Sequence, residues 1–163
     1  MMKSLVALAF GLTGFTSAMA EDVPASLIVD AGGMQWAWAS PCAPSAPSCG
    51  ADLVMHDGWS VASAGDFASS FTGFADLSAK FGAGATCASA YFNSGYSHCD
   101  DVNVDPSYAN VRVWNAPAAW GPNTMDDYSE TFVVRAVPEP GTYALMFAGL
   151  GLVGFIARRR QRD

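Results

Sequence analysis

Residues 34–38 read Met34-Gln35-Trp36-Ala37-Trp38, so large apolar side chains alternate with smaller or polar ones. A period of two places Met34, Trp36 and Trp38 on one face of a β-strand. Large aromatic side chains at strand spacing are usually core residues. The segment therefore predicts a strand whose inner face carries Trp36 and Trp38 into the hydrophobic core.

The clearest helix signal lies at residues 63–74. Ser63 can cap a helix N-terminus, and Asp66 stands three residues later, as in a capping box. Phe67, Phe71 and Phe74 then recur at i, i+4 and i+7, which places them on one helical face. The apolar pattern continues less regularly for one more turn before glycines end it.

Four other short segments have the composition of strands. They are residues 26–30, 53–55, 111–114 and 131–137. One or two short helices among short strands predict a small α+β domain, and the alternative is a β-sandwich.

The first twenty residues have the three parts of a signal peptide. Lys3 supplies the positive start, Leu5–Phe15 is a short apolar run, and Ala18-Met19-Ala20 places small residues before a cleavage site. We therefore expect the export machinery to carry the chain outward and signal peptidase to cut between Ala20 and Glu21. The competing interpretation is a buried N-terminal helix.

The last residues combine a motif, a span and a charge cluster. Pro138-Glu139-Pro140 precedes residues 141–157, which hold no charge. Seventeen helical residues extend about 26 Å, enough for a short transmembrane helix. Arginines follow within residues 158–162 and are expected to stay in the cytoplasm, so the preceding domain lies outside. The anchoring arginines are Arg158, Arg159 and Arg160.

This tail, residues 138–163, resembles the PEP-CTERM sorting signal, with Pro138-Glu139-Pro140 as its motif. The resemblance implies processing by an exosortase, a membrane-embedded enzyme of bacteria that make exopolysaccharide and biofilm. It implies a precursor in the inner membrane and a final place at the cell surface or in the extracellular matrix. The alternative is a plain membrane anchor.

The segment between the ends, residues 21–137, has the size of one globular domain. It carries thirteen acidic side chains against Lys80, Arg112 and Arg135, which leaves a net charge of −10. Because such a surface repels phosphate backbones, a nucleic-acid partner is excluded.

All four cysteines, Cys42, Cys49, Cys87 and Cys99, lie in this exported segment. An even count outside the cytoplasm favours disulfides. Each successive pair brackets a loop rich in small and turn-forming residues, so we expect Cys42–Cys49 and Cys87–Cys99 bonds. The rival interpretation is a thiolate metal site, although neither pair has C-x₂-C spacing.

No catalytic motif stands out, so we expect no enzymatic activity and no cofactor. Asp101, Asn103 and Asp105 have the spacing that opens a Ca²⁺-binding loop, but the later ligand positions do not fit, and a solvated acidic turn is the favoured interpretation. Trp120 sits in the turn Ala119-Trp120-Gly121-Pro122, and we expect its ring to be the exposed tryptophan that could stack on a sugar.

A second resemblance concerns residues 57–67, Asp57-Gly58-Trp59-Ser60-Val61-Ala62-Ser63-Ala64-Gly65-Asp66-Phe67. They are similar to a segment that joins a strand to the first helix in bacterial C-type-lectin-like domains, and residues 130–135 are similar to the final strand. The resemblance implies a lectin-like α+β fold, which does not by itself imply sugar binding.

These observations predict a structural protein of the cell surface or of the biofilm matrix, sorted through its tail. The alternative is a module that binds carbohydrate, such as exopolysaccharide, or binds through Ca²⁺. A secreted enzyme is the third hypothesis.

Overall fold

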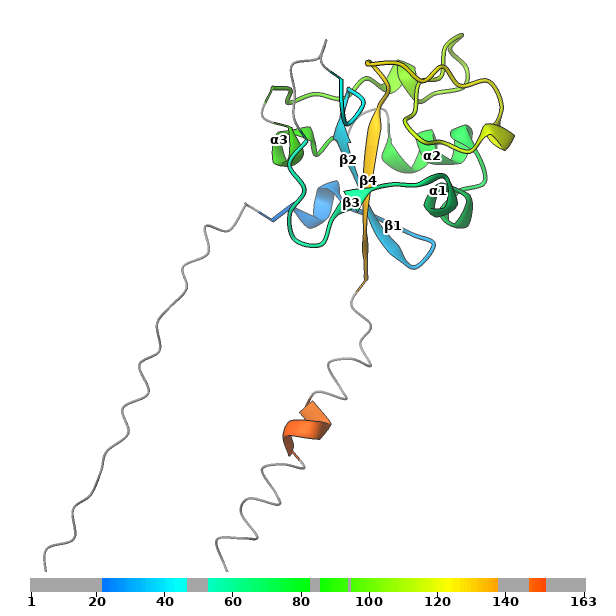
Figure 1. Cartoon of the computed structure of the whole chain (residues 1–163). Helices are drawn as coiled ribbons and strands as arrows, with labels where there is room; N and C mark the ends of the chain where they lie inside the picture. Colours follow the sequence, from blue (N-terminus) through cyan, green and yellow to red (C-terminus); the bar gives the residue numbers. More distant parts are fainter. Residues whose placement is uncertain (1–21, 47–52, 83–85, 94, 138–146, 152–163) are drawn as a thin grey trace, which may run out of the picture.

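The computed structural model describes residues 22–46, 53–82, 86–93, 95–137 and 147–151 (Figure 1). A four-stranded antiparallel sheet organises the domain, in the strand order β1-β2-β4-β3. This sheet and its short helices confirm the predicted α+β class. The β-sandwich alternative is wrong, because helices cover the sheet in the described part of the chain.

The strands are β1 (Val29–Ala31), β2 (Met34–Ser40), β3 (Ser60–Val61) and β4 (Thr131–Ala136). The α-helices are α1 (Ala64–Ser70), α2 (Phe74–Phe81) and α3 (Ser89–Phe92), and the 3₁₀ turns are η1 (Ala25–Leu27), η3 (Asp101–Asn103) and η4 (Ala118–Trp120).

The centre of the sheet is the pair β2–β4, which joins an early strand to the last one. Trp36 lies opposite Val134 and Trp38 lies opposite Phe132, so four large side chains share one face. Both tryptophans are buried, as predicted. Because facing side chains in an antiparallel pair stabilise each other, this register fixes the core.

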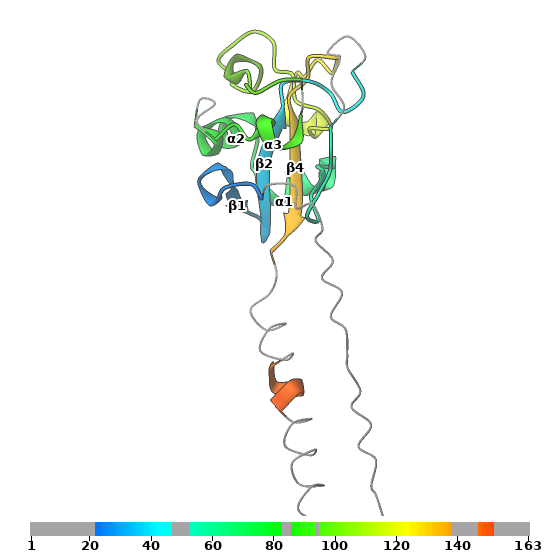
Figure 2. The same cartoon turned by 90° about the vertical axis from the view of Figure 1, so that its left-hand side faces the viewer.

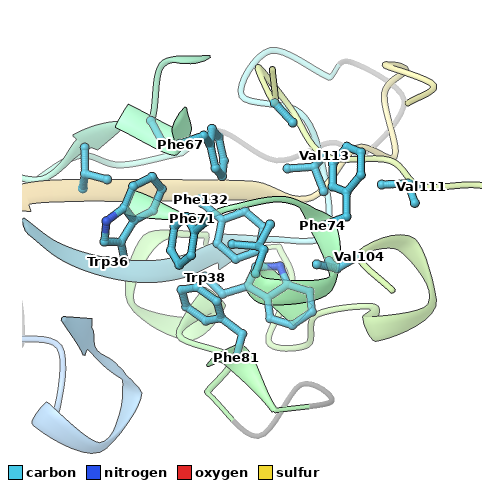
Figure 3. Close-up of a cluster of buried hydrophobic side chains, with 14 residues drawn as sticks. Trp36, Trp38, Phe67, Phe71, Phe74, Phe81, Val104, Val111, Val113 and Phe132 are labelled. Carbon is cyan, nitrogen blue, oxygen red and sulfur yellow. The ribbon is translucent and has the colours of Figure 1, made fainter. Parts of the chain in front are cut away.

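Helices α1 and α2 cover that aromatic face, and Figure 3 shows the side chains that meet there. Trp36 packs between Phe67 and Phe71, with ring centroids 5.0 and 4.7 Å apart. Trp38 stacks on Phe132 at 5.3 Å. Edge-to-face and offset rings of this kind add to the stabilisation that burial provides.

Helix α3 lies on the opposite side of the sheet from α1 and α2 (Figures 1 and 2). There the small residues Ala37 and Ala39 of β2 let Phe92 approach the sheet, and Trp59 closes the same cluster. The sheet therefore has helices on both faces, with the aromatic side forming the larger core.

The predicted capping box is present. Ser63 Oγ accepts from the Asp66 amide, and the Asp66 carboxylate accepts from the Ser63 amide at 2.9 Å. The expectation of one helix through Phe74 is wrong, because α1 ends before the extended Phe71 and α2 begins at Phe74. The Thr72 amide donates to Asp76 Oδ2 at 3.0 Å, which ties the linker to the first turn of the second helix.

The strand predictions hold in part. Residues 131–137 form β4 as expected, whereas residues 26–30 begin in η1 and pair only from Val29. Residues 53–55 and 111–114 are not strands, since each makes one isolated bridge. Their apolar side chains serve packing, and the backbone follows loops.

Candidate functional site

A cleft of about 290 Å³ opens where β2 ends and β4 begins. Ser40 pairs with Thr131 at this end of the sheet, whereas Met34 pairs with Ala136 at the other. The cleft therefore lies at the opposite end of the sheet from the point where the chain leaves β4. The residues that line it come from distant segments: Pro41, Cys42, Tyr96, His98, Asp100, Asn103, Arg112 and Tyr128.

A disulfide holds one side of the cleft in place. Cys87 and Cys99 are bonded, as the spacing predicts, with Cα atoms 5.6 Å apart. Cys87 also bridges to Trp38 of β2, so the bond ties the lining residues His98 and Asp100 to the sheet. The predicted partner of Cys42, Cys49, lies outside the described residues, and that pairing stays a prediction.

Buried Asn93 holds the neighbouring loop. Its Oδ1 accepts from the amides of Gly95 and Tyr96 at 2.8 and 3.1 Å. Its Nδ2 donates to Ser40 Oγ at 2.9 Å. The Tyr96 ring then lies 5.6 Å from the His98 ring, edge to face. Sequence reasoning missed Asn93, since nothing in a single asparagine signals burial.

Glu130 lies behind the cleft lining, in contact with the lining residue Asn103. It is fully buried, and its Oε2 accepts from Trp38 Nε1 at 2.7 Å while its Oε1 accepts from Asn103 Nδ2 at 3.2 Å. The pKa of Glu130 is raised to about 8, chiefly by burial; the hydrogen bonds from Asn103 and Trp38 oppose the rise, and the nearby charge of Asp100 contributes to it. With no exposed surface, Glu130 cannot touch a ligand and instead positions Asn103.

Arg112 lies next to Glu130 and lines the cleft. Its amide donates to the Asn103 carbonyl at 2.7 Å, and its carbonyl accepts from the Glu130 amide at 2.8 Å. Its guanidinium pairs with Asp126 at 3.4 Å. The Nε–H is buried with no hydrogen-bond partner among the described residues. Backbone hydrogen bonds thus fix the position of Arg112, while its Nε–H makes no hydrogen bond within the described part of the chain.

The cleft mixes groups of several kinds. Asp100 brings a carboxylate, Asn103 an amide and Arg112 a guanidinium, while Tyr128, 52 % exposed, brings an aromatic ring and a hydroxyl. A few directed polar groups beside aromatic surface suit a small polar ligand. Neither Arg112 nor Tyr128 carried a site signal in the sequence.

The Ca²⁺ candidates are not brought together. Asn103 donates to Asp100 and Glu130, and exposed Asp105 accepts from the Ser107 amide at 2.8 Å, which lowers the pKa of Asp105. Among the described residues no group of three or more acidic, histidine or cysteine side chains could hold a metal. Asp101 begins the 3₁₀ turn η3, and the solvated acidic turn that the sequence favoured stays a prediction.

The prediction for Trp120 is wrong. Its ring packs edge-on against Phe67 at 5.7 Å and Phe74 at 5.3 Å, and it closes the aromatic core beside η4. The turn composition predicted exposure, but two phenylalanines distant in sequence pack against the ring and leave it partly buried. It cannot serve as a free stacking platform.

The processing residues fall outside the described residues. They include the expected cleavage site Ala20–Glu21, the motif Pro138-Glu139-Pro140 and the cluster Arg158–Arg160. Of the expected span 141–157, residues 147–151 are described and helical, and their apolar side chains Phe147 and Leu150 are exposed. None of the helices in the described part of the chain combines the length and hydrophobicity that a membrane crossing requires.

The comparison with protein families matches the tail. Residues 136–161 match the model of the PEP-CTERM protein-sorting motif. No curated protein and no solved structure matches the chain. The chain therefore carries a PEP-CTERM protein-sorting motif and is an exported, cell-envelope-associated protein that an exosortase sorts.

Proposed function

We propose that this protein acts at the cell surface or in the extracellular matrix, where its domain binds saccharide units of exopolysaccharide. The observation that carries the proposal is the cleft, in which Asp100, Asn103 and Arg112 lie beside the exposed ring of Tyr128. Sugar hydroxyls both donate and accept hydrogen bonds, and sugar rings pack on aromatic faces. This lining offers partners for both kinds of contact.

The position of the cleft supports a display role. The sorting motif begins at Ala136, the last residue of β4, and the cleft opens at the far end of that strand. Six strand residues extend about 20 Å. A domain held by its C-terminal end would therefore point the cleft away from its attachment.

We propose binding without catalysis. Hydrolysis of a glycosidic bond needs two carboxyl groups that reach the substrate. Among the residues that line the cleft Asp100 supplies one, and Glu130 is fully buried. We also propose a lectin-like arrangement. Residues 57–67 run through β3 into α1, and residues 131–135 lie in the last strand, β4, in keeping with the resemblance.

Binding of polysaccharide to the purified segment 21–137 tests the proposal. Tyr128→Ala should weaken binding about tenfold, the loss expected for one ring contact. Tyr108→Ala is the matched control, because Tyr108 is equally exposed, at 53 %, and is not among the cleft-lining residues. If a broad glycan array gives no binding, or if both variants lose it equally, the chain has a structural role without this ligand.

A further inference from the structure

The second feature of interest is the opposite end of the sheet, which we call the foot and define as Asp22, Gln35, Asp57, Gly58, Arg135 and Ala136. It contains a hollow of about 350 Å³, lined by Gln35, the Asp57-Gly58 turn, Arg135 and Ala136. In Figures 1 and 2 the foot lies where β4 ends and β1 and β2 join in their hairpin.

The foot is continuous with the sorting motif. The family match begins at Ala136, which still pairs with Met34 in the sheet. Consecutive Cα atoms are 3.8 Å apart, so Pro138 lies within about 8 Å of Ala136 in any conformation. An enzyme that grips residues 138–140 is far larger than this distance. The foot therefore lies within its reach while it reads the motif.

The side chain of Arg135 is fixed at this surface by three contacts. Its Nε donates to Gln35 Oε1 at 2.8 Å, its NH1 pairs with Asp22 Oδ1 at 3.3 Å, and its guanidinium lies 4.5 Å over the Trp59 ring. Within the described part of the chain these contacts use Nε and NH1, and the remaining guanidinium N–H groups can donate to a partner. A side chain that is already fixed loses little entropy on binding.

Asp57 supplies the opposite charge on the other rim. It sits in a turn with Gly58, at φ 49° and 79°, and its side chain is 42 % exposed. His56 Nδ1 lies 2.9 Å from the carboxylate and restrains it. A Cβ at Gly58 would meet no atom within 4 Å, so the hollow is open beside the turn.

We propose that the foot is the surface on which the exosortase docks while it reads the motif. The enzyme would present a hydrogen-bond acceptor to Arg135 and a donor to Asp57. The enzyme would then recognise both the tail and the folded domain. Only a folded sheet would place the charges of Arg135 and Asp57 beside the motif. The proposal rests on the sorting motif and is independent of saccharide binding at the other end of the sheet.

Processing of the full-length precursor in an exosortase-bearing host tests this docking. Asp57→Asn and Arg135→Gln should each slow loss of the precursor at least fivefold. Asp76→Asn and Lys80→Gln are the matched controls, since they alter a surface pair, 3.8 Å apart, on α2 and should leave the rate unchanged. Limited proteolysis of the membrane-bound chain reports whether each variant stays folded.

A second arm separates docking from folding. A spacer of ten Gly and Ser residues inserted after Val137 should slow the wild-type chain to the rate of the foot variants. The same spacer should abolish the difference between wild type and the Asp57→Asn chain, because the motif is then read far from the foot. The proposal is overturned if the spacer has no effect, if the foot variants are processed at the wild-type rate, or if their slowing persists with the spacer.

Discussion

Replacing Glu130 by Gln should remove a pH dependence of folding from the domain. Burial raises the pKa of Glu130 from 4.5 to about 8 in the folded chain. Between these values the folded chain keeps a proton that the unfolded chain releases, so the free energy of unfolding falls as pH rises. One such group changes this free energy by up to about 1.4 kcal/mol per pH unit, with a ceiling of about 5 kcal/mol across the window.

Glutamine imitates the protonated carboxyl for a geometric reason. Because an indole N–H only donates, the oxygen that faces Trp38 must remain an acceptor, and the proton belongs on Oε1, which faces Asn103. To accept that proton the Asn103 amide has to turn its carbonyl oxygen toward Oε1, which replaces the contacts that its Nδ2 donates to Glu130 and, at 3.4 Å, to Asp100. The Glu130→Gln side chain can make the same pair of contacts, with its NH₂ in place of the O–H.

Urea unfolding of segment 21–137, followed by tryptophan fluorescence from pH 5 to 8.5, measures the effect. At pH 5 the two chains should be equally stable within about 1 kcal/mol. At pH 8 the Glu130→Gln variant should be more stable by several kcal/mol, bounded by the same ceiling of about 5. A constant difference between the two curves over the whole range would mean that Glu130 is ionised in the folded chain, and the reasoning would fail.

Two other predictions concern the scaffold. Replacing Cys87 and Cys99 together by Ser should lower the free energy of unfolding by about 3 kcal/mol, the chain-entropy value for a loop of this size. Thermal unfolding with and without reductant measures this loss, and an unchanged melting temperature would contradict the prediction. Gly32→Ala should destabilise the domain more than Gly33→Ala in the same assay. Both glycines have positive φ, but only a Cβ at Gly32 would clash, since it would lie 2.8 Å from Ser70 Cα. Equal losses of stability in the two variants would contradict this clash.

The parts of the fold that the sequence predicted are those that local patterns determine. The alternation around Trp36 and Trp38 depends only on the pleat of a strand, and the Ser63–Asp66 box depends only on one helical turn. The break between α1 and α2 was missed because three phenylalanines at helical spacing also suit two helices packed on one core. Residues 111–114 have strand composition, but Val113 makes one isolated bridge, to Glu130 just before β4, and the pairing does not extend into a strand.

The cleft could not be predicted in the same way. Its lining comes from segments that a disulfide and the Glu130 hydrogen bonds bring together. Glu130 itself looks like the polar first residue of a strand, and only the folded chain reveals its burial. The sorting tail is the opposite case, because its three parts are contiguous and the family match rests on sequence alone.

The difference between the two ends of the sheet originates in one irregularity. The β2–β4 register is regular from Met34 to Trp38 and shifts before Ser40, which places Ser40 opposite Thr131. Such a bulge re-aims the side chains that follow it. Here Ser40 Oγ accepts from Asn93 Nδ2 at 2.9 Å, and Thr131 Oγ1 donates to the carbonyl of the next cleft residue, Cys42, at 2.7 Å. At the regular end, β4 therefore continues directly into the sorting motif. At the bulged end, the segments that follow β2 and precede β4 diverge, and the cleft lies between them.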